Sequence, residues 1–142
     1  MQKNYNTTIL KKYKILITGI NGFIGKSISK LLLNEGYDVW GIDRSSSNKK
    51  IIKANLLDNS EIKEAKKKMP DFCIIIHAAA LAHSKTLFDN ESIFDDNVKM
   101  YQNVLNVFAN INTHIILLSS VAVYGEANRN EEVKIKDKLR PS

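Results

Sequence analysis

Cysteine, proline and long apolar segments are scarce in this sequence, and each absence excludes a class of protein. A single cysteine among 142 residues excludes an internal disulfide framework and a zinc site built from several cysteines. The apolar runs are far shorter than the ~20 residues that a membrane helix needs, and the polar N-terminus lacks the apolar core of a secretory signal. We therefore expect a cytoplasmic protein with no membrane partner.

Positive charge is in excess, but its pattern does not favour nucleic acid as a partner. The chain carries 21 Lys+Arg against 15 Asp+Glu, a formal net charge of +6. Only three of these basic residues are arginines, the side chain best suited to clamp phosphates and read bases, and no aromatic residues alternate with the short lysine clusters. We expect a solvated basic surface that helps to attract a phosphorylated ligand.

Short apolar runs alternate with segments of helical spacing in this chain, which is about one domain long. The expected strands cover residues 14–19, 37–43, 51–54, 71–77 and 113–120. The expected helices cover 23–34, a lysine-rich segment that begins at Asp58 or Ser60 and ends before Pro70, and 91–110. This alternation predicts a doubly wound, Rossmann-like α/β fold whose five parallel strands lie in the order 3-2-1-4-5. The inner side of helix 91–110 is predicted to carry Ile93, Phe94, Val98, Tyr101, Leu105 and Phe108.

Three of the six glycines fall within seven residues, between the first expected strand and the first expected helix. Gly19 permits a tight turn out of the strand, Gly22 lets the backbone approach a pyrophosphate, and Gly25 allows the helix to pack closely on the strand. The helix N-terminus then offers free N–H groups to the anion. A structural turn is the alternative, but the strand–turn–helix context favours binding of a dinucleotide.

An acidic residue stands where a dinucleotide fold holds the adenosine ribose. Asp43 ends the second expected strand, 18 residues after Gly25, and its carboxylate can accept hydrogen bonds from both ribose hydroxyls. The same charge repels a 2′-phosphate, so we expect NAD rather than NADP. Arg44 follows directly and could serve a 2′-phosphate, and a role for Asp43 in the turn alone stays open.

Five motifs in a fixed order carry a resemblance to a known family. They are TGINGFIG at 18–25, WGID at 40–43, IIIHAAA at 74–80, DDNV at 95–98 and LLSSVAVYG at 117–125. With these motifs, residues 13–126 resemble the NAD-binding part of the extended short-chain dehydrogenases/reductases, and most of all the NAD-dependent sugar-nucleotide epimerases and dehydratases. The resemblance implies hydride transfer between a sugar carbon of a nucleotide-sugar and NAD in the complete enzyme, and a homodimer that forms through helix 91–110.

The resemblance also implies roles for individual residues. The N–H groups of Phe23 and Ile24 would bind the pyrophosphate, Ser120 would hold the reacting oxygen of the substrate, and Asn97 would have a structural role beside the cofactor. Adenine contact would come from Asn55, with Leu56 beside it, or from Asp58. The remaining cofactor contacts implied by the family are made by small residues after the fourth strand, namely Ala78, Ala79 and Ala80.

One family motif is missing from the chain. The family's acid/base pair has the form Tyr-x-x-x-Lys, but the residues four positions after the five tyrosines are Ile9, Ile17, Gly41, Leu105 and Asn128. We expect residues 1–12 to be a lead-in and residues 127–142 a polar tail that ends before this pair, so the fold would be incomplete relative to the family. The 142 residues alone would then be catalytically inactive. The alternative interpretations are a non-catalytic NAD-binding module or a decayed, truncated relative.

The three histidines do not suggest a metal site. No two of them share a helix face at i,i+4 spacing. His77 lies at the end of the fourth expected strand, where we expect it to be a hydrogen-bonded structural residue.

Overall fold

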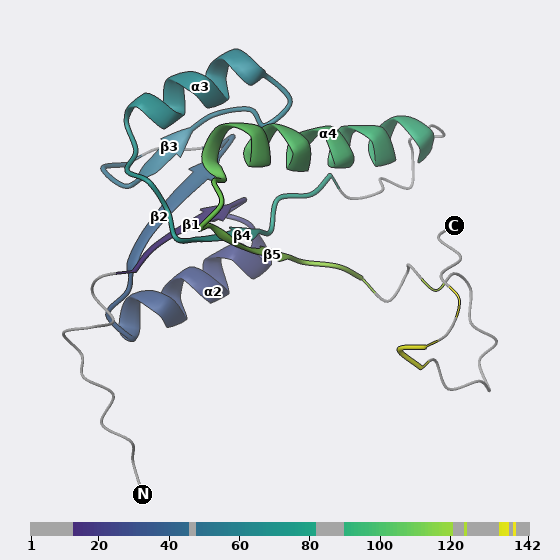
Figure 1. Ribbon diagram of the computed structural model, residues 1–142, viewed down its shortest axis with the longest axis horizontal. Helices are drawn as coiled ribbons and strands as arrows, with labels where there is room; N and C mark the ends of the chain where they lie inside the picture. Colours follow the sequence, from purple (N-terminus) through teal and green to yellow (C-terminus); the bar gives the residue numbers. More distant parts are fainter. Residues whose placement is uncertain are drawn as a thin grey trace, which may run out of the picture.

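The computed structural model describes residues 13–45, 48–81, 90–120, 124, 134–136 and 138. Five parallel strands form its sheet in the order β3-β2-β1-β4-β5, as the sequence predicted (Figure 1). The strands are β1 (Lys14–Thr18), β2 (Asp38–Asp43), β3 (Ile51–Lys53), β4 (Ile74–His77) and β5 (His114–Leu117). The helices are α2 (Phe23–Asn34), α3 (Asn59–Lys67) and α4 (Asn90–Phe108). The expected lead-in, residues 1–12, lies outside the described residues, as does most of the expected tail.

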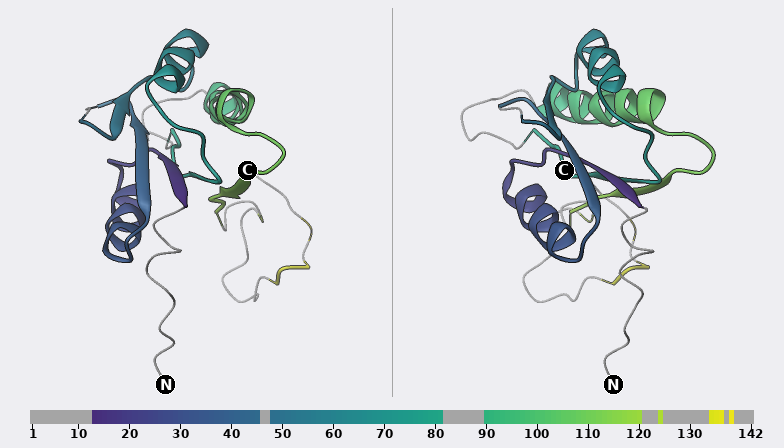
Figure 2. Two further views of the ribbon diagram at one scale, coloured as in Figure 1. Left: turned by 60° about the vertical axis from the view of Figure 1, so that its left-hand side comes forward. Right: turned by 90° about the vertical axis from the view of Figure 1, so that its left-hand side faces the viewer.

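Helices cover both faces of the sheet. Figures 1 and 2 show α2 on one face and α3 with α4 on the other. Side chains alternate along β1 to match, since Ile15 and Ile17 pack with residues of α2 while Leu16 packs with residues of α3 and α4. A parallel sheet whose strands are buried on both sides needs such near-continuous apolar runs, which is why the pattern could be recognised in the sequence.

Local signals set the ends of two helices where the sequence predicted them. After the last turn of α2, Gly36 takes a φ of +87°, and the Tyr37 N–H donates to the Leu32 carbonyl over 3.0 Å, so glycine supports this helix stop. Of the two expected caps for α3, Asp58 is the one used. Its carboxylate accepts from the N–H groups of Ser60 and Glu61, which satisfies two donors of the first turn.

The predicted inner side of α4 was partly wrong. Ile93 and Phe108 are buried, as expected, but the side chains of Phe94 and Val98 are 63% and 38% exposed. The buried stripe continues instead through Met100 and Val104, together with the two correctly predicted residues. A helix turns by about 100° per residue, so Phe94 points in a different direction from its buried neighbour Ile93.

Strand β5 lies at the edge of the sheet and is shorter than the predicted run. Its pairing with β4 spans His114 to Leu117, and the side chains of Ile116 and Leu117 are exposed.

Among the described residues, no helix is long and apolar enough to cross a membrane.

Candidate functional site

The glycine turn between β1 and α2 has the tight geometry that its spacing predicted. Gly19 has a φ of +66°, and a Cβ atom there would lie 2.8 Å from the Cα of Ala79. A Cβ on Gly25 would lie 2.2 Å from the Gly19 carbonyl oxygen, and one on Gly22 would lie 3.1 Å from the same atom. Each glycine therefore occupies a position where a side chain meets backbone, most severely at Gly25.

The turn leads into a helix whose first N–H groups lack a side-chain cap. Gly22 is the N-cap of α2, and the first turn of the helix holds no acidic residue. Phe23 and Ile24 begin the helix with exposed side chains. The first N–H groups of a helix have no intrahelical acceptor, so this end of α2 suits an anion.

Asp43 lies next to this turn at the carboxyl end of β2. Its Oδ2 accepts from the N–H of Asn21 over 3.0 Å, and its Oδ1 accepts from the N–H and the hydroxyl of Ser45 over 2.9 and 2.6 Å. Burial raises the pKa of Asp43, but the hydrogen bonds from Ser45 and Asn21 outweigh it and hold the pKa below its usual value. The group is therefore a carboxylate at neutral pH, oriented by the turn that it contacts.

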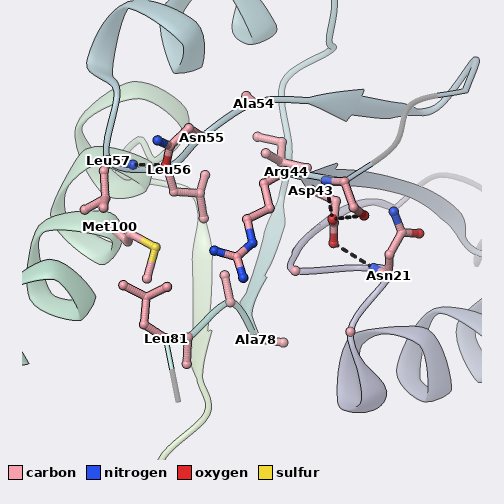
Figure 3. A pocket seen from close by; sticks show the side chains of 16 residues that line it. Asn21, Asp43, Arg44, Ala54, Asn55, Leu56, Leu57, Ala78, Leu81 and Met100 are labelled. Atoms are coloured by element: carbon pink, nitrogen blue, oxygen red, sulfur yellow. Dashed lines mark hydrogen bonds between the residues drawn. The ribbon is translucent and has the colours of Figure 1, made fainter. Parts of the chain in front are cut away.

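These groups border one cavity of about 610 Å³. Figure 3 shows Asp43 and Asn21 at one side of it, Leu57 and Met100 at the other, and the side chain of Arg44 reaching between them toward Leu56 and Ala78. Of the residues predicted to bind a cofactor, eight line the cavity: Gly19, Gly22, Asp43, Asn55, Leu56, Ala78, Ala79 and Ala80. The structure thus brings together residues from the loops that follow β1, β2, β3 and β4.

The loop after β3 distinguishes the two candidates for adenine contact. Asn55 lines the cavity, and its Oδ1 accepts from the N–H of Leu57 over 3.1 Å. Asp58 is absent from the cavity lining, and its carboxylate caps α3. Placement in the structure therefore favours Asn55 over Asp58.

Behind the cavity, a buried histidine joins the ends of β1 and β4. Nδ1 of His77 lies 2.9 Å from the hydroxyl of Thr18, and the same hydroxyl accepts from the N–H of Ala79 over 3.3 Å. Burial lowers the pKa of His77 to about 4, and the side chain packs against the ring of Tyr101. His77 is therefore a neutral, hydrogen-bonded structural residue, as the sequence predicted.

Four other predicted residues lie outside the cavity lining, in addition to Gly25. Phe23 and Ile24 follow the glycine turn in α2. Asn97 contacts the lining indirectly, because its side chain accepts from the N–H of Leu81 over 2.8 Å and donates to the Leu81 carbonyl over 3.1 Å. Ser120 lies three residues after the end of β5. Most of the motif that follows it, residues 121–123 and 125, lies outside the described residues.

Sequence analysis missed several residues that shape the cavity. Ser45 holds Asp43, in part through an Asx turn in which the Asp accepts from the backbone N–H two residues later. Leu57, Leu81 and Met100 line the far wall and carried no recognisable motif. Arg44 is the residue that could serve a 2′-phosphate, and among the described residues no carboxylate forms an ion pair with it.

A family comparison agrees with this architecture. Residues 15–142 match the NAD dependent epimerase/dehydratase family. The chain belongs to this family. Cinnamoyl-CoA reductase 1 from Petunia hybrida is 29% identical over 140 residues, which is 87% of this chain and 40% of the relative.

Solved structures of similar proteins have the same fold. An ADP-L-glycero-D-manno-heptose-6-epimerase from Helicobacter pylori has a TM-score of 0.79 at 21% identity, with 99% of this chain and 48% of that chain covered. A UDP-glucose 4-epimerase from Brucella ovis, solved in complex with NAD, has a TM-score of 0.74 at 26% identity, with 92% and 42% covered. The chain thus spans less than half the length of these relatives.

The residues present fit the cofactor that the family name implies. A dinucleotide needs an anion site for its pyrophosphate, an acceptor for its ribose hydroxyls and a partly apolar place for its base. Here an uncapped helix N-terminus, the Asp43 carboxylate and the wall formed by Leu56, Leu81 and Met100 border the same space.

Proposed function

We propose that this chain binds NAD in the cavity between the glycine turn and the loop after β3. One observation carries the proposal: the Asp43 carboxylate contacts the turn that begins at Gly19, and both line a single cavity of about 610 Å³. The pyrophosphate would bind at the N–H groups of Phe23 and Ile24. The two ribose hydroxyls would donate to Asp43, one to the site that Asn21 leaves on Oδ2 and the other to Oδ1 in place of the Ser45 hydroxyl.

Other predicted residues would complete the binding site. The adenine would lie against Asn55 and Leu56, and the backbone of residues 78–80 would pass close to the rest of the cofactor. Asn97 would hold this last segment in place through Leu81. These roles are supported by position in the cavity wall and by the paired hydrogen bonds of Asn97.

We further propose a preference for NAD over NADP. Hydrogen bonds lower the pKa of Asp43, so a negative charge would face the 2′-phosphate of NADP. Arg44 also reaches into the cavity, and its charge would offset part of this repulsion. We expect the carboxylate to dominate, since Asn21 and Ser45 hold it in place.

For the complete enzyme we propose hydride transfer on a nucleotide-sugar. The cofactor, when bound, accepts or returns the hydride. Ser120 would bind the sugar oxygen whose carbon is oxidised or reduced. The 142 residues contain no Tyr-x-x-x-Lys pair to move the proton, so this chain by itself would bind without turnover, and a binding module is the second candidate function.

Calorimetric titration of the purified chain with NAD and NADP tests the proposal. Wild-type protein should bind NAD more tightly than NADP. Asp43→Asn should weaken NAD by about 10- to 100-fold, since a hydrogen bond to a charged group is worth about 1.5–3 kcal/mol, and should weaken NADP much less. Ser45→Ala is the matched control, because it removes one contact of Asp43 but keeps the charge. Absence of NAD binding at millimolar concentration would refute the proposal.

We also propose that α4 contributes to a homodimer. Phe94 and Val98 are exposed and lie four residues apart, so they form one apolar strip on the helix. Analytical ultracentrifugation of the wild type and of Phe94→Glu tests this. The wild type should sediment as a dimer and the variant as a monomer, whereas a monomeric wild type at high concentration would contradict the proposal.

A further inference from the structure

Asn97 of α4 holds Leu81 at one part of the cavity wall, and a second asparagine of the same helix contacts another part. The Nδ2 of Asn103 donates to the Leu56 carbonyl over 2.9 Å, in the loop after β3. Met100 lies between the two asparagines in the helix and lines the cavity itself. Positions three residues apart differ by about 60° around a helix, so Asn97, Met100 and Asn103 lie toward the same side of α4. This side contacts both parts of the cavity wall.

The loop that Asn103 contacts has one unusual backbone group. Leu56 itself is buried, yet among the described residues nothing accepts a hydrogen bond from its N–H. The neighbouring N–H groups all donate within the protein: Ala54 to the Asp43 carbonyl over 3.0 Å, Asn55 to Glu61 Oε2 over 2.8 Å, Leu57 to Asn55 Oδ1 over 3.1 Å and Asp58 to the Asn55 carbonyl over 3.0 Å.

The direction of this N–H group follows from its peptide. The peptide between Asn55 and Leu56 is trans, since the described residues contain no cis bond, so its N–H and C=O point in opposite directions. The carbonyl faces Asp58 at the start of α3. The Leu56 N–H therefore points away from α3, in a segment whose other face is the cavity.

The following peptide is held at both of its polar groups. Asn103 binds the Leu56 carbonyl, and the side chain of Asn55 binds the Leu57 N–H. A buried carbonyl without a partner is unfavourable, so loss of the Asn103 amide would let this peptide rotate toward another donor. The two peptides share the Cα of Leu56, so a rotation that shifts this atom would also displace the Leu56 N–H.

We propose that Asn103 is a positioning residue for adenine recognition. By holding the Leu56 carbonyl, it keeps the Leu56 N–H directed at the ring nitrogen N1 of the adenine. The amide oxygen of Asn55 lies in the same loop, so a donor and an acceptor match the N1 acceptor and the amino group of adenine. This inference rests on the proposed binding of NAD.

A base-exchanged cofactor tests the inference directly. Nicotinamide hypoxanthine dinucleotide carries a hydrogen on N1 and an oxygen in place of the amino group, so it can neither accept from the Leu56 N–H nor donate to the Asn55 amide oxygen. By calorimetric titration, the wild-type chain should bind NAD at least about tenfold more tightly than this analogue, because both hydrogen bonds are lost. Asn103→Ala should weaken NAD about tenfold and bring the ratio close to one, because the peptide that rotates also holds the Asn55 side chain through the Leu57 N–H.

Asn106 provides a matched control on the same helix. Its side chain is exposed, so Asn106→Ala makes the same chemical change without touching the cavity and should keep the tenfold ratio. Asn103→Asp, which keeps the shape but loses the donor, should behave like Asn103→Ala. Thermal unfolding of each variant separates lost stability from lost discrimination.

Each outcome bears on the inference in a different way. A folded Asn103→Ala that still prefers NAD tenfold would overturn it and leave the proposed function intact, because the bond would then be structural only. If neither variant folds, equal binding of the two dinucleotides by the wild type would overturn it. A wild type that binds neither dinucleotide would refute the proposed function as well.

Discussion

The buried histidine predicts that mild acid destabilises the fold well before its carboxylates titrate. His77 is 4% exposed and its pKa is lowered to about 4 by burial, against about 6.5 in an unfolded chain. Between pH 4 and pH 6.5, the histidine ring therefore binds a proton in the unfolded state but not in the folded state. Stability from the neutral ring is fully present above pH 6.5 and declines as the pH falls toward 4.

The size of the effect follows from the two pKa values of His77. Linkage between proton binding and folding gives a loss of about 2 kcal/mol between pH 7.5 and pH 5.0. That is a large part of the roughly 5–15 kcal/mol that stabilises a typical domain. Asp43 adds little in this window, because its pKa is lowered and its contribution is lost only at more acidic pH.

Urea unfolding followed by circular dichroism at the two pH values measures this difference. His77→Asn is the matched control, since an amide can replace Nδ1 as the partner of the Thr18 hydroxyl but does not titrate. The variant should lose less than about 0.5 kcal/mol over the same interval. A wild type whose unfolding free energy changes no more than that of the variant would show that the histidine titrates normally in the fold.

Two further predictions concern the glycine turn and catalysis. Gly25→Ala should lower the unfolding free energy by about 2–3 kcal/mol, since its Cβ would lie 2.2 Å from the Gly19 carbonyl oxygen. Gly22→Ala should lose less than half as much, because its Cβ would lie 3.1 Å from the same atom. Equal losses in urea unfolding would contradict this geometry. The purified 142-residue chain should show no turnover of a nucleotide-sugar with NAD by chromatography of the products, because none of its tyrosines has the partner lysine, and any cofactor-dependent conversion would refute this.

The strand order and the turn could be predicted because local signals coincided with the global pattern. Apolar runs such as 74–76 are continuous where helices cover both faces of the sheet, and the glycines at 19, 22 and 25 stand where side chains would meet backbone. Asp43 was predicted from its distance along the chain, and the structure places it against the same turn. Each of these features leaves a run or a spacing that can be recognised within one short segment of the sequence.

The parts that could not be predicted depend on contacts between distant segments. Phe94 was assigned to the wrong side of α4, because an apolar residue beside the buried stripe is hard to distinguish from a member of it by spacing alone. Asn103 carried no signal as a partner of Leu56, from which it is 47 residues away. Asn55 and Asp58 stayed equivalent until the structure showed that Asp58 caps α3.

The position of the cavity follows from the order of the strands. The chain passes from β1 outward through β2 to β3 and then returns to β4 on the other side of β1, and the helices that follow β1 and β4, α2 and α4, lie on opposite faces of the sheet (Figure 2). A crevice opens at such a point of reversal. The floor of this crevice lies where Gly19 approaches Ala79. A Cβ atom on Gly19 would lie only 2.8 Å from the Cα of Ala79. The crevice therefore depends on the glycine after β1, because any side chain at Gly19 would meet the backbone after β4 and force the two strand ends apart.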